Sequence, residues 1–114
     1  MSEERLPTHL WVSAKLRECN GDLVSAYVRH NGERHGGSVI LKLDLYDKGC
    51  KVLTQARDLE GRLGWMSAFK EGLVPSEKAE DYIERAIRRD PDVWVVEIEH
   101  PEGWHPFEGP EITF

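Results

Sequence analysis

Four residues near the C-terminus have side chains that could take part in catalysis or hold a metal. Glu97 and Glu99 lie two positions apart, and His100 and His105 follow them. In a strand, residues two apart share a face, so one carboxylate could raise the pKa of the other for acid-base work. Imidazole with carboxylate also suits zinc or iron, provided that at least three ligands converge. These residues support one hypothesis: a small metal-dependent or carboxylate-based enzyme.

The same residues also have a purely structural interpretation. Alternating glutamates commonly form the solvated face of a strand, and histidines among prolines are ordinary residues of an extended segment. No serine or cysteine lies in a recognisable nucleophile motif, and no glycine run has the spacing of a phosphate-binding loop. We therefore expect no catalytic residue, no metal and no cofactor, and we favour a protein that is not an enzyme.

The charge of the chain argues against nucleic acid as a partner. The 114 residues include 15 Lys and Arg against 21 Asp and Glu, for a formal net charge of −6. An acidic protein repels a phosphate backbone unless its basic residues gather on one face. The one basic cluster, Arg85, Arg88 and Arg89, instead lies at the end of a predicted helix, where cations complement the helix dipole.

The cysteines and the apolar segments indicate the compartment. Cys19 and Cys50 are far apart and form no Cys-x-x-Cys motif, so we expect two reduced thiols. The acidic, polar start of the chain does not resemble a signal peptide, and no apolar run approaches the length of a membrane span. These absences predict a cytoplasmic protein that does not bind a membrane.

Hydrophobic spacing predicts two helices. The first begins at Thr8, as its N-cap, and ends at Asn20-Gly21, since glycine readily adopts the left-handed conformation that ends helices. The second begins at Ser76, also as its N-cap, and runs to Arg89. Its apolar residues recur at the helical period: Ala79, Tyr82, Ile83, Ala86 and Ile87.

The segments between and after these helices predict a sheet. Strands are expected over residues 23–29, 38–46, 51–57, 64–69 and 93–98. Asn31-Gly32 favours a hairpin between the first two, because both residues tolerate positive φ. Residues 38–46 alternate apolar and polar side chains, which predicts a strand that is buried on one face only. The first four strands would then form an antiparallel meander.

Residues His100 to Phe114 are expected to form an extended arm that packs along an edge of the sheet. This segment contains three prolines and two glycines, but Trp104, Phe107 and Phe114 make it too apolar for a free tail. Buried aromatic residues are common anchors of interfaces. Trp104, with Phe107, is therefore the best candidate for binding a partner, and packing within the chain is the equal alternative.

Three stretches of the sequence resemble a known family. They are Leu10-Trp11-Val12-Ser13-Ala14, the segment from Arg57-Asp58 through Gly64-Trp65-Met66, and the segment from Asp90 to Glu99. Together they resemble domain-of-unknown-function family 1491, a family of short uncharacterised bacterial proteins, over nearly the whole chain. The resemblance implies a bacterial source and a single domain, but it implies no reaction, ligand or catalytic residue.

These observations lead to one prediction for the fold and two hypotheses for the function. We expect residues 1–114 to form a single α+β domain, an antiparallel sheet of four or five strands with two helices on one face. The favoured function is that of a non-enzymatic accessory or protein-interaction domain that forms a homodimer, because catalytic motifs are absent while aromatic residues are plentiful. The alternative is the enzyme centred on Glu97, Glu99, His100 and His105.

Overall fold

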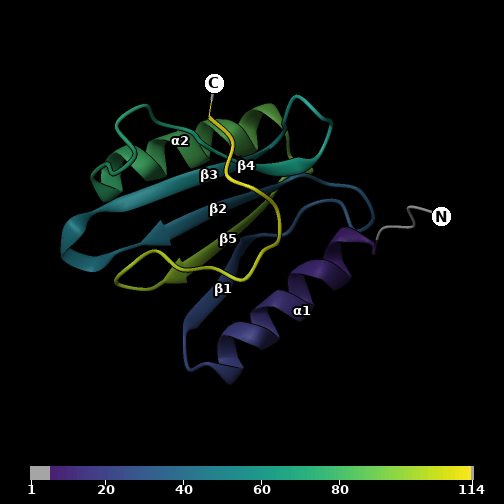
Figure 1. Ribbon diagram of the computed structural model, residues 1–114, viewed down its shortest axis with the longest axis horizontal. Coiled ribbons are helices and arrows are strands. Elements are labelled where there is room, and N and C mark those ends of the chain that lie inside the picture. The colour runs from purple at the N-terminus through teal and green to yellow at the C-terminus, as the bar shows by residue number, and fades with distance from the viewer. Residues whose placement is uncertain (1–5, 114) are drawn as a thin grey trace.

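The computed structural model describes residues 6–113 and has an α+β architecture, with an open five-stranded sheet between two helical layers (Figure 1). In chain order, the elements are α1 (Thr8–Gly21), β1 (Ser25–His30), β2 (Val39–Asp44), the 3₁₀ turn η1 (Tyr46–Lys48), β3 (Cys50–Arg57), β4 (Leu63–Ser67), α2 (Ser76–Arg89) and β5 (Trp94–Glu99). Cys19 and Cys50 are both free and buried.

The strand order is β1-β5-β2-β3-β4, so the last strand of the chain lies between the first two. β5 pairs antiparallel with β1 but parallel with β2, where Val39 lies opposite Trp94 and Asp44 lies opposite Glu99. The sheet is therefore mixed. The prediction of a purely antiparallel sheet is wrong, and so is the prediction of a hairpin between β1 and β2.

Burial explains why β5 occupies this inner position. Nearly every residue of β2 and β5 is buried, whereas the residues of β1 alternate between exposed and half-buried. A strand that is buried on both faces needs neighbours on each side and cover on each face, while a strand whose residues alternate between exposed and half-buried suits an edge. The connection through β3, β4 and α2 is long enough for the crossover that parallel pairing requires.

The segment after β1 is a loop that folds over Trp94. The Trp94 indole Nε1 donates a hydrogen bond to the carbonyl oxygen of Glu33 at 2.8 Å, and the backbone N–H of Glu33 donates to Asp92 at 2.9 Å. A side chain at Gly32 would collide with the carbonyl oxygen of Asp92. Gly32 is thus required for the close approach of two backbone segments and not for a hairpin turn.

The two helices cover opposite faces of the sheet, so the prediction that both lie on one face is wrong. Val39, Leu41 and Leu43 of β2 pack in the cluster that α1 covers, whereas Ile40 packs with the α2 residue Ile83 in a second cluster. The prediction that β2 is buried on one face only is also wrong. The face that carries Lys42, which was expected to be solvated, is covered by α2. Each helix supplies one of the two covers that the central strands need.

Both helices span the predicted residues, but the residues that cap them differ from the predictions. Pro7 and Pro75 occupy the N-cap positions, and neither helix has a side-chain cap. Thr8 instead donates from its Oγ1 to the carbonyl oxygens of His35 and Gly37, both at 3.2 Å. After α1, the left-handed residue is Leu23, at φ 60°. Neither helix of the described chain is long and apolar enough to cross a bilayer.

The C-terminal segment packs against the α1-covered face and the outer edge of β4. Phe107 and Ile112 are both buried. The Trp65 N–H donates to the carbonyl oxygen of Pro110, and the Ile112 N–H donates to the carbonyl oxygen of Trp65, both at 2.8 Å. These bonds pair part of an edge that would otherwise be open. In Figure 1 the segment crosses in front of the sheet toward α2.

Candidate functional site

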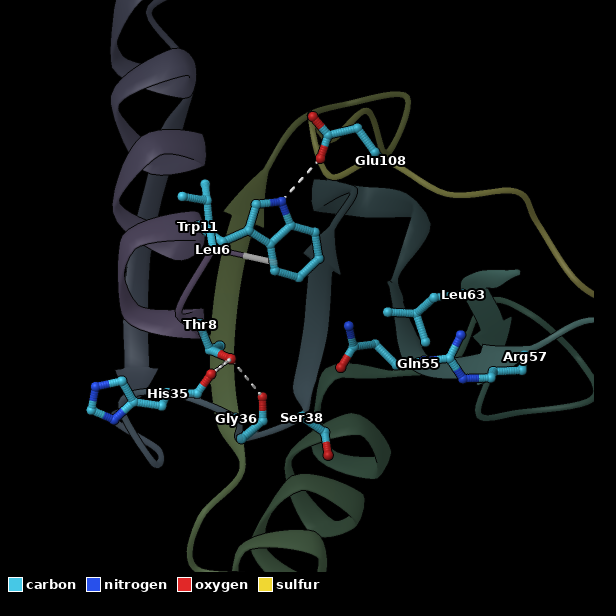
Figure 2. Close-up of a pocket in the computed structure, with 11 residues that line it drawn as sticks. Leu6, Thr8, Trp11, His35, Gly36, Ser38, Gln55, Arg57, Leu63 and Glu108 are labelled. Carbon is cyan, nitrogen blue, oxygen red and sulfur yellow. Dashed lines mark hydrogen bonds between the residues drawn. The ribbon is translucent and has the colours of Figure 1, made fainter. Parts of the chain in front are cut away.

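An open groove of about 560 Å³ lies where α1, the sheet and the C-terminal segment meet (Figure 2). Its lining comes from five parts of the chain: Leu6, Thr8 and Trp11 at the start of α1, residues 35–38 before β2, Gln55 and Arg57 of β3, Leu63 of β4, and Glu108. A smaller hollow of about 210 Å³ continues it toward Trp65 and Gly109, and the two share Trp11, Gln55, Leu63 and Glu108.

The floor of the groove is the uncovered end of the β3–β4 ribbon. Side chains two apart in a strand share a face, so Gln55 and Arg57 continue the face on which Leu53 packs in the α1-covered core. Arg57 lies opposite Leu63, and Gln55 lies opposite Trp65. Cover on this face reaches Leu53 and Trp65 but not Arg57, which is exposed. The floor of the groove therefore carries both polar and apolar side chains and is open to solvent.

The wall of the groove is the indole ring of Trp11, which is held on three sides. It stacks on Trp65 with ring centroids 6.3 Å apart and meets the edge of Phe107 at 5.0 Å. Its Nε1 donates a hydrogen bond to the Glu108 carboxylate at 2.9 Å. A ring fixed in this way can accept an apolar group without losing much conformational entropy.

Hydrogen-bond donors and one cation dominate the polar part of the floor. The Gln55 Oε1 accepts a hydrogen bond from the Val39 N–H at 2.8 Å, which leaves its amide nitrogen facing the groove (Figure 2). Arg57 donates to the carbonyl oxygen of Gly61 at 2.7 Å and forms no ion pair with any residue that the structure describes. Both groups can therefore donate to a ligand.

The acid at the rim, Glu108, does not neutralise Arg57, because it is already paired. Lys15 lies 2.5 Å from its Oε2, and Trp11 donates to its Oε1. The hydrogen bond from Lys15, aided by Trp11, holds the pKa of the Glu108 carboxyl below its usual range. Among residues 6–113, the groove thus keeps a positive charge without an acidic partner, in a protein whose net charge is negative.

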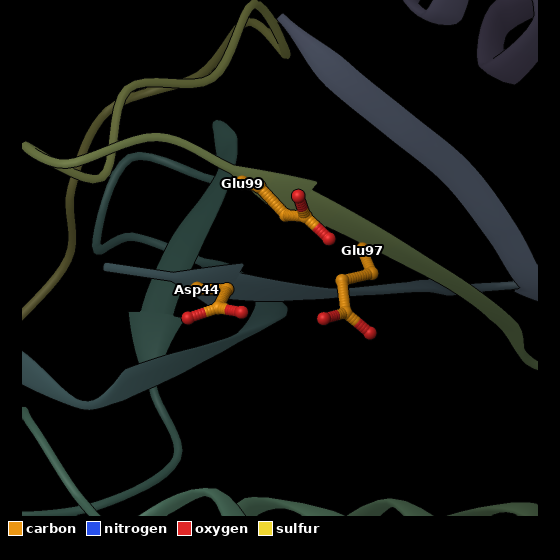
Figure 3. Close-up of side chains that lie close together, drawn as sticks. All are labelled: Asp44, Glu97 and Glu99. Carbon is orange, nitrogen blue, oxygen red and sulfur yellow. The ribbon is translucent and has the colours of Figure 1, made fainter. Parts of the chain in front are cut away.

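On the opposite face of the sheet, three carboxylates form an acidic cluster (Figure 3). One oxygen each from Asp44, Glu97 and Glu99 lies within 4.8 Å of the others. The sequence predicted the Glu97 and Glu99 pair but missed Asp44, which the parallel register of β2 and β5 places opposite Glu99. Three oxygen ligands suit a hard cation. Each carboxylate, however, already has a partner in the chain.

Glu97 belongs to a network of four charges, two of them buried, that attaches α2 to the sheet. Arg29 lies 2.5 Å from Glu97 and 2.6 Å from Glu80 of α2. Lys42 lies 2.5 Å from Glu80 and 3.6 Å from Glu97. The two cations balance the two carboxylates, and Lys42 and Glu97 each keep only 5% of their surface exposed. The arrangement supports a structural role for Glu97.

The other members of the acidic cluster have local partners. Tyr27 donates from its hydroxyl to Glu99 at 3.2 Å, and the backbone N–H of Tyr46 donates to Asp44 at 2.9 Å. Burial, followed by the charge of Glu97 and the hydrogen bond to Glu99, raises the pKa of Tyr27 to about 12. Tyr27 therefore remains a neutral donor at physiological pH.

The two predicted histidines do not join the carboxylates. His105 packs edge-on to Trp65, with centroids 6.0 Å apart, on the face that α1 covers. Burial lowers the pKa of His105, which favours the neutral ring. His100 accepts a hydrogen bond at Nδ1 from the Glu102 N–H at 3.1 Å, within its own turn. The four residues of the enzyme hypothesis are thus divided between two faces.

The two predicted partner-binding residues also separate. Phe107 is 4% exposed and packs against Trp11 and Trp65 in the chain's own core, whereas Trp104 is 37% exposed and contacts the His100 ring at 5.9 Å. Of the two, only Trp104 is accessible to a partner, and its binding of one stays a prediction. The groove residues Trp11, Gln55, Arg57 and Leu63 were not predicted.

The charge network predicts a loss of stability in acid. Hydrogen bonds from Arg29, then from Lys42, lower the pKa of Glu80 from 4.5 to about 2. Because the folded protein holds the lower pKa, ionised Glu80 contributes its full stability above pH 4.5, and this contribution is lost as the pH falls toward 2. Urea unfolding across this range should therefore be less pH-dependent in Glu80→Gln than in the wild type.

The control for this prediction is Glu84→Gln, on the exposed side of the same helix. It should keep the pH dependence of the wild type. Parallel loss of stability in Glu80→Gln and the wild type would contradict the assigned role of Glu80.

Comparison with known proteins gives this fold a family. The family model for proteins of unknown function, DUF1491, matches residues 6–108. The chain belongs to the DUF1491 family. The crystal structure of a DUF1491 protein from Caulobacter crescentus CB15 is 31% identical, with a TM-score of 0.84 over 95% of this chain and 100% of that chain.

Two further solved structures are similar to this DUF1491 protein. An NMR structure of a family protein from Caulobacter crescentus CB15 has 31% identity and a TM-score of 0.80, covering 95% of this chain and 97% of the other. The solution structure of a protein from A. tumefaciens has 25% identity and a TM-score of 0.70, covering 85% and 87%. No curated protein matches the chain. The resemblance seen in the sequence is thus confirmed.

Proposed function

We propose that this protein is a non-enzymatic binding domain that holds an extended segment of a partner protein in the groove beside α1. The observation that carries the proposal is the position of the Gln55 amide and of Arg57, which is exposed and has no ion-pair partner within residues 6–113, beside the fixed Trp11 ring. Binding sites typically combine apolar walls with a few convergent polar groups.

An extended polypeptide suits the shape of this groove. The groove is open to solvent and continues into a second hollow, so an extended chain can lie along both. In an extended chain, residues i and i+2 point the same way. A bound segment can therefore place one side chain against Trp11 and the side chain two residues later over Leu63. The cytoplasmic location and the homodimer predicted from the sequence stay predictions.

The alternative, a carboxylate-based or metal-dependent enzyme, has weaker support. Its central residue, Glu97, is neutralised by Arg29 and Lys42, and His105 lies on the other face of the sheet. A general base or metal ligand needs a lone pair that a substrate or ion can reach. Asp44 and Glu99 each accept one hydrogen bond and keep acceptor sites, but Glu97 could join them in binding an ion only if its ion pairs with Arg29 and Lys42 were broken.

The proposal predicts that Leu63→Ala weakens peptide binding. A library of short random peptides is selected on the immobilised wild-type protein, and the enriched peptides are titrated in solution by calorimetry. Loss of the Leu63 contact should raise Kd by about 5- to 10-fold, which corresponds to roughly 1 to 1.4 kcal/mol.

The matched control is Leu59→Ala, in the turn between β3 and β4. Leu59 is 96% exposed and does not line the groove, so this variant should keep the wild-type Kd. Equal affinities in all three proteins, or no enriched peptide at all, would contradict the proposal. Thermal unfolding of each variant confirms that the fold is unchanged before binding is compared.

A further inference from the structure

We infer that the bound segment carries an acidic side chain, whose carboxylate binds the Arg57 guanidinium and the Gln55 amide at the floor of the groove. The inference rests on the proposed function, because it specifies the chemistry of the same partner. It depends on the directions in which these two side chains can still donate, on the charge of Arg57, which has no acidic partner in the described part of the chain, and on the apolar surface beside them.

The first step concerns the free donors of the two residues. Gln55 and Arg57 lie two apart on β3 and point to the same face, so both reach the same part of a ligand. The bond from the Val39 N–H to the Gln55 oxygen fixes the amide, and its nitrogen can only donate. Arg57 uses one nitrogen on Gly61 and keeps the rest of its planar fork, which matches the two oxygens of a carboxylate.

The second step concerns charge. Arg62, on the same β3–β4 ribbon, is paired with Asp58 at 2.8 Å and with Glu60 at 3.0 Å. Arg57 has no such partner among residues 6–113, although the chain has six more acidic than basic residues. Glu108 forms an ion pair with Lys15 at the rim of the groove and does not pair with Arg57. Because its charge is already balanced, Glu108 does not require a cation from the ligand. A carboxylate is the complement that this floor lacks.

The third step concerns the surroundings of the carboxylate. Leu63 lies opposite Arg57 in the ladder, and Leu6 and Trp11 stand on the other side of the groove. An aspartate or glutamate that reaches Arg57 therefore has neighbours that must contact apolar surface. The bound segment should combine an acidic residue with large apolar residues. A nucleic acid does not fit, because one guanidinium is too little charge to hold a phosphate backbone against a net charge of −6.

The inference is tested with the peptides that bind the wild-type protein. Synthetic copies with both termini blocked are compared with copies in which each Asp or Glu is replaced by Asn or Gln. The replacement should raise Kd for the wild-type protein by about tenfold or more, and for Arg57→Gln by less than about twofold. Added salt should weaken binding of the acidic peptides by the wild type more than by Arg57→Gln.

Arg88→Gln is the matched control, since it removes the same charge from the exposed surface of α2. It should keep the full difference between the acidic and the neutral peptides. Enriched peptides without an acidic residue, or an equal effect of the replacement on the wild type and on Arg57→Gln, would overturn the inference while the proposed function stands. Peptides that bind independently of Leu63 would instead overturn the proposed function itself.

Discussion

Phe107→Ala should lower the free energy of unfolding by about 3 to 5 kcal/mol, the usual cost of removing a buried phenylalanine ring. Phe107 is 4% exposed and lies within 6.0 Å of the Trp65 ring and 5.0 Å of the Trp11 ring, centroid to centroid. Its loss leaves a cavity between the C-terminal segment and the sheet. Urea unfolding monitored by tryptophan fluorescence and by circular dichroism measures the loss.

Trp104→Ala is the matched control for this prediction. It removes a larger ring from the same segment, but Trp104 is 37% exposed and lies outside the core clusters. The expected loss is under about 1 kcal/mol, as for most surface substitutions. If both variants lost the same stability, the assignment of Phe107 as the residue that anchors the C-terminal segment would be wrong.

Glu97→Ala should lower the free energy of unfolding by about 3 to 5 kcal/mol at neutral pH. The variant leaves Lys42, which is 5% exposed, with Glu80 as its only anionic partner within salt-bridge distance among the described residues. Arg29 and Lys42 then share the single carboxylate of Glu80, and a net charge left without full compensation beside a buried lysine is costly. Denaturant titration of the purified variant at neutral pH measures this effect.

Glu99→Ala, two residues further along β5, is the control. Glu99 accepts a hydrogen bond from Tyr27 but also lies near the like charges of Asp44 and Glu97, so the two effects offset each other. We expect a change of less than about 1 kcal/mol. A stable Glu97→Ala protein would argue against the structural role of Glu97 and would strengthen the enzyme alternative.

These two predictions probe the two halves of one architecture. Phe107 belongs to the cluster that α1 and the C-terminal segment cover, and Glu97 belongs to the face that α2 covers. The groove lies where α1 and the C-terminal segment no longer cover the sheet. Its floor is thus a consequence of how far α1 and the C-terminal segment extend over the β3–β4 ribbon.

The sequence by itself determined the local elements of this protein. Both helices span the predicted residues, and β5 was predicted from its β-branched residues, because the helical and strand periods are properties of neighbouring residues. The shared face of Glu97 and Glu99 was also predicted, since residues two apart in a strand always lie on one side. The motifs near Trp11, Trp65 and Trp94 were enough to indicate the family.

Only the tertiary structure decided the strand order and the faces that the helices cover. The insertion of β5 beside β2 joins residues that are distant in the chain, and no local pattern specifies such pairing. For this reason the sequence did not predict that Asp44 belongs to the acidic cluster, or that His105 lies on the opposite face of the sheet from Glu97 and Glu99. From the sequence, Gln55 and Arg57 were assigned no role beyond their place in the strand expected over residues 51–57. They line a groove only because Trp11, from the far end of the sequence, packs beside them.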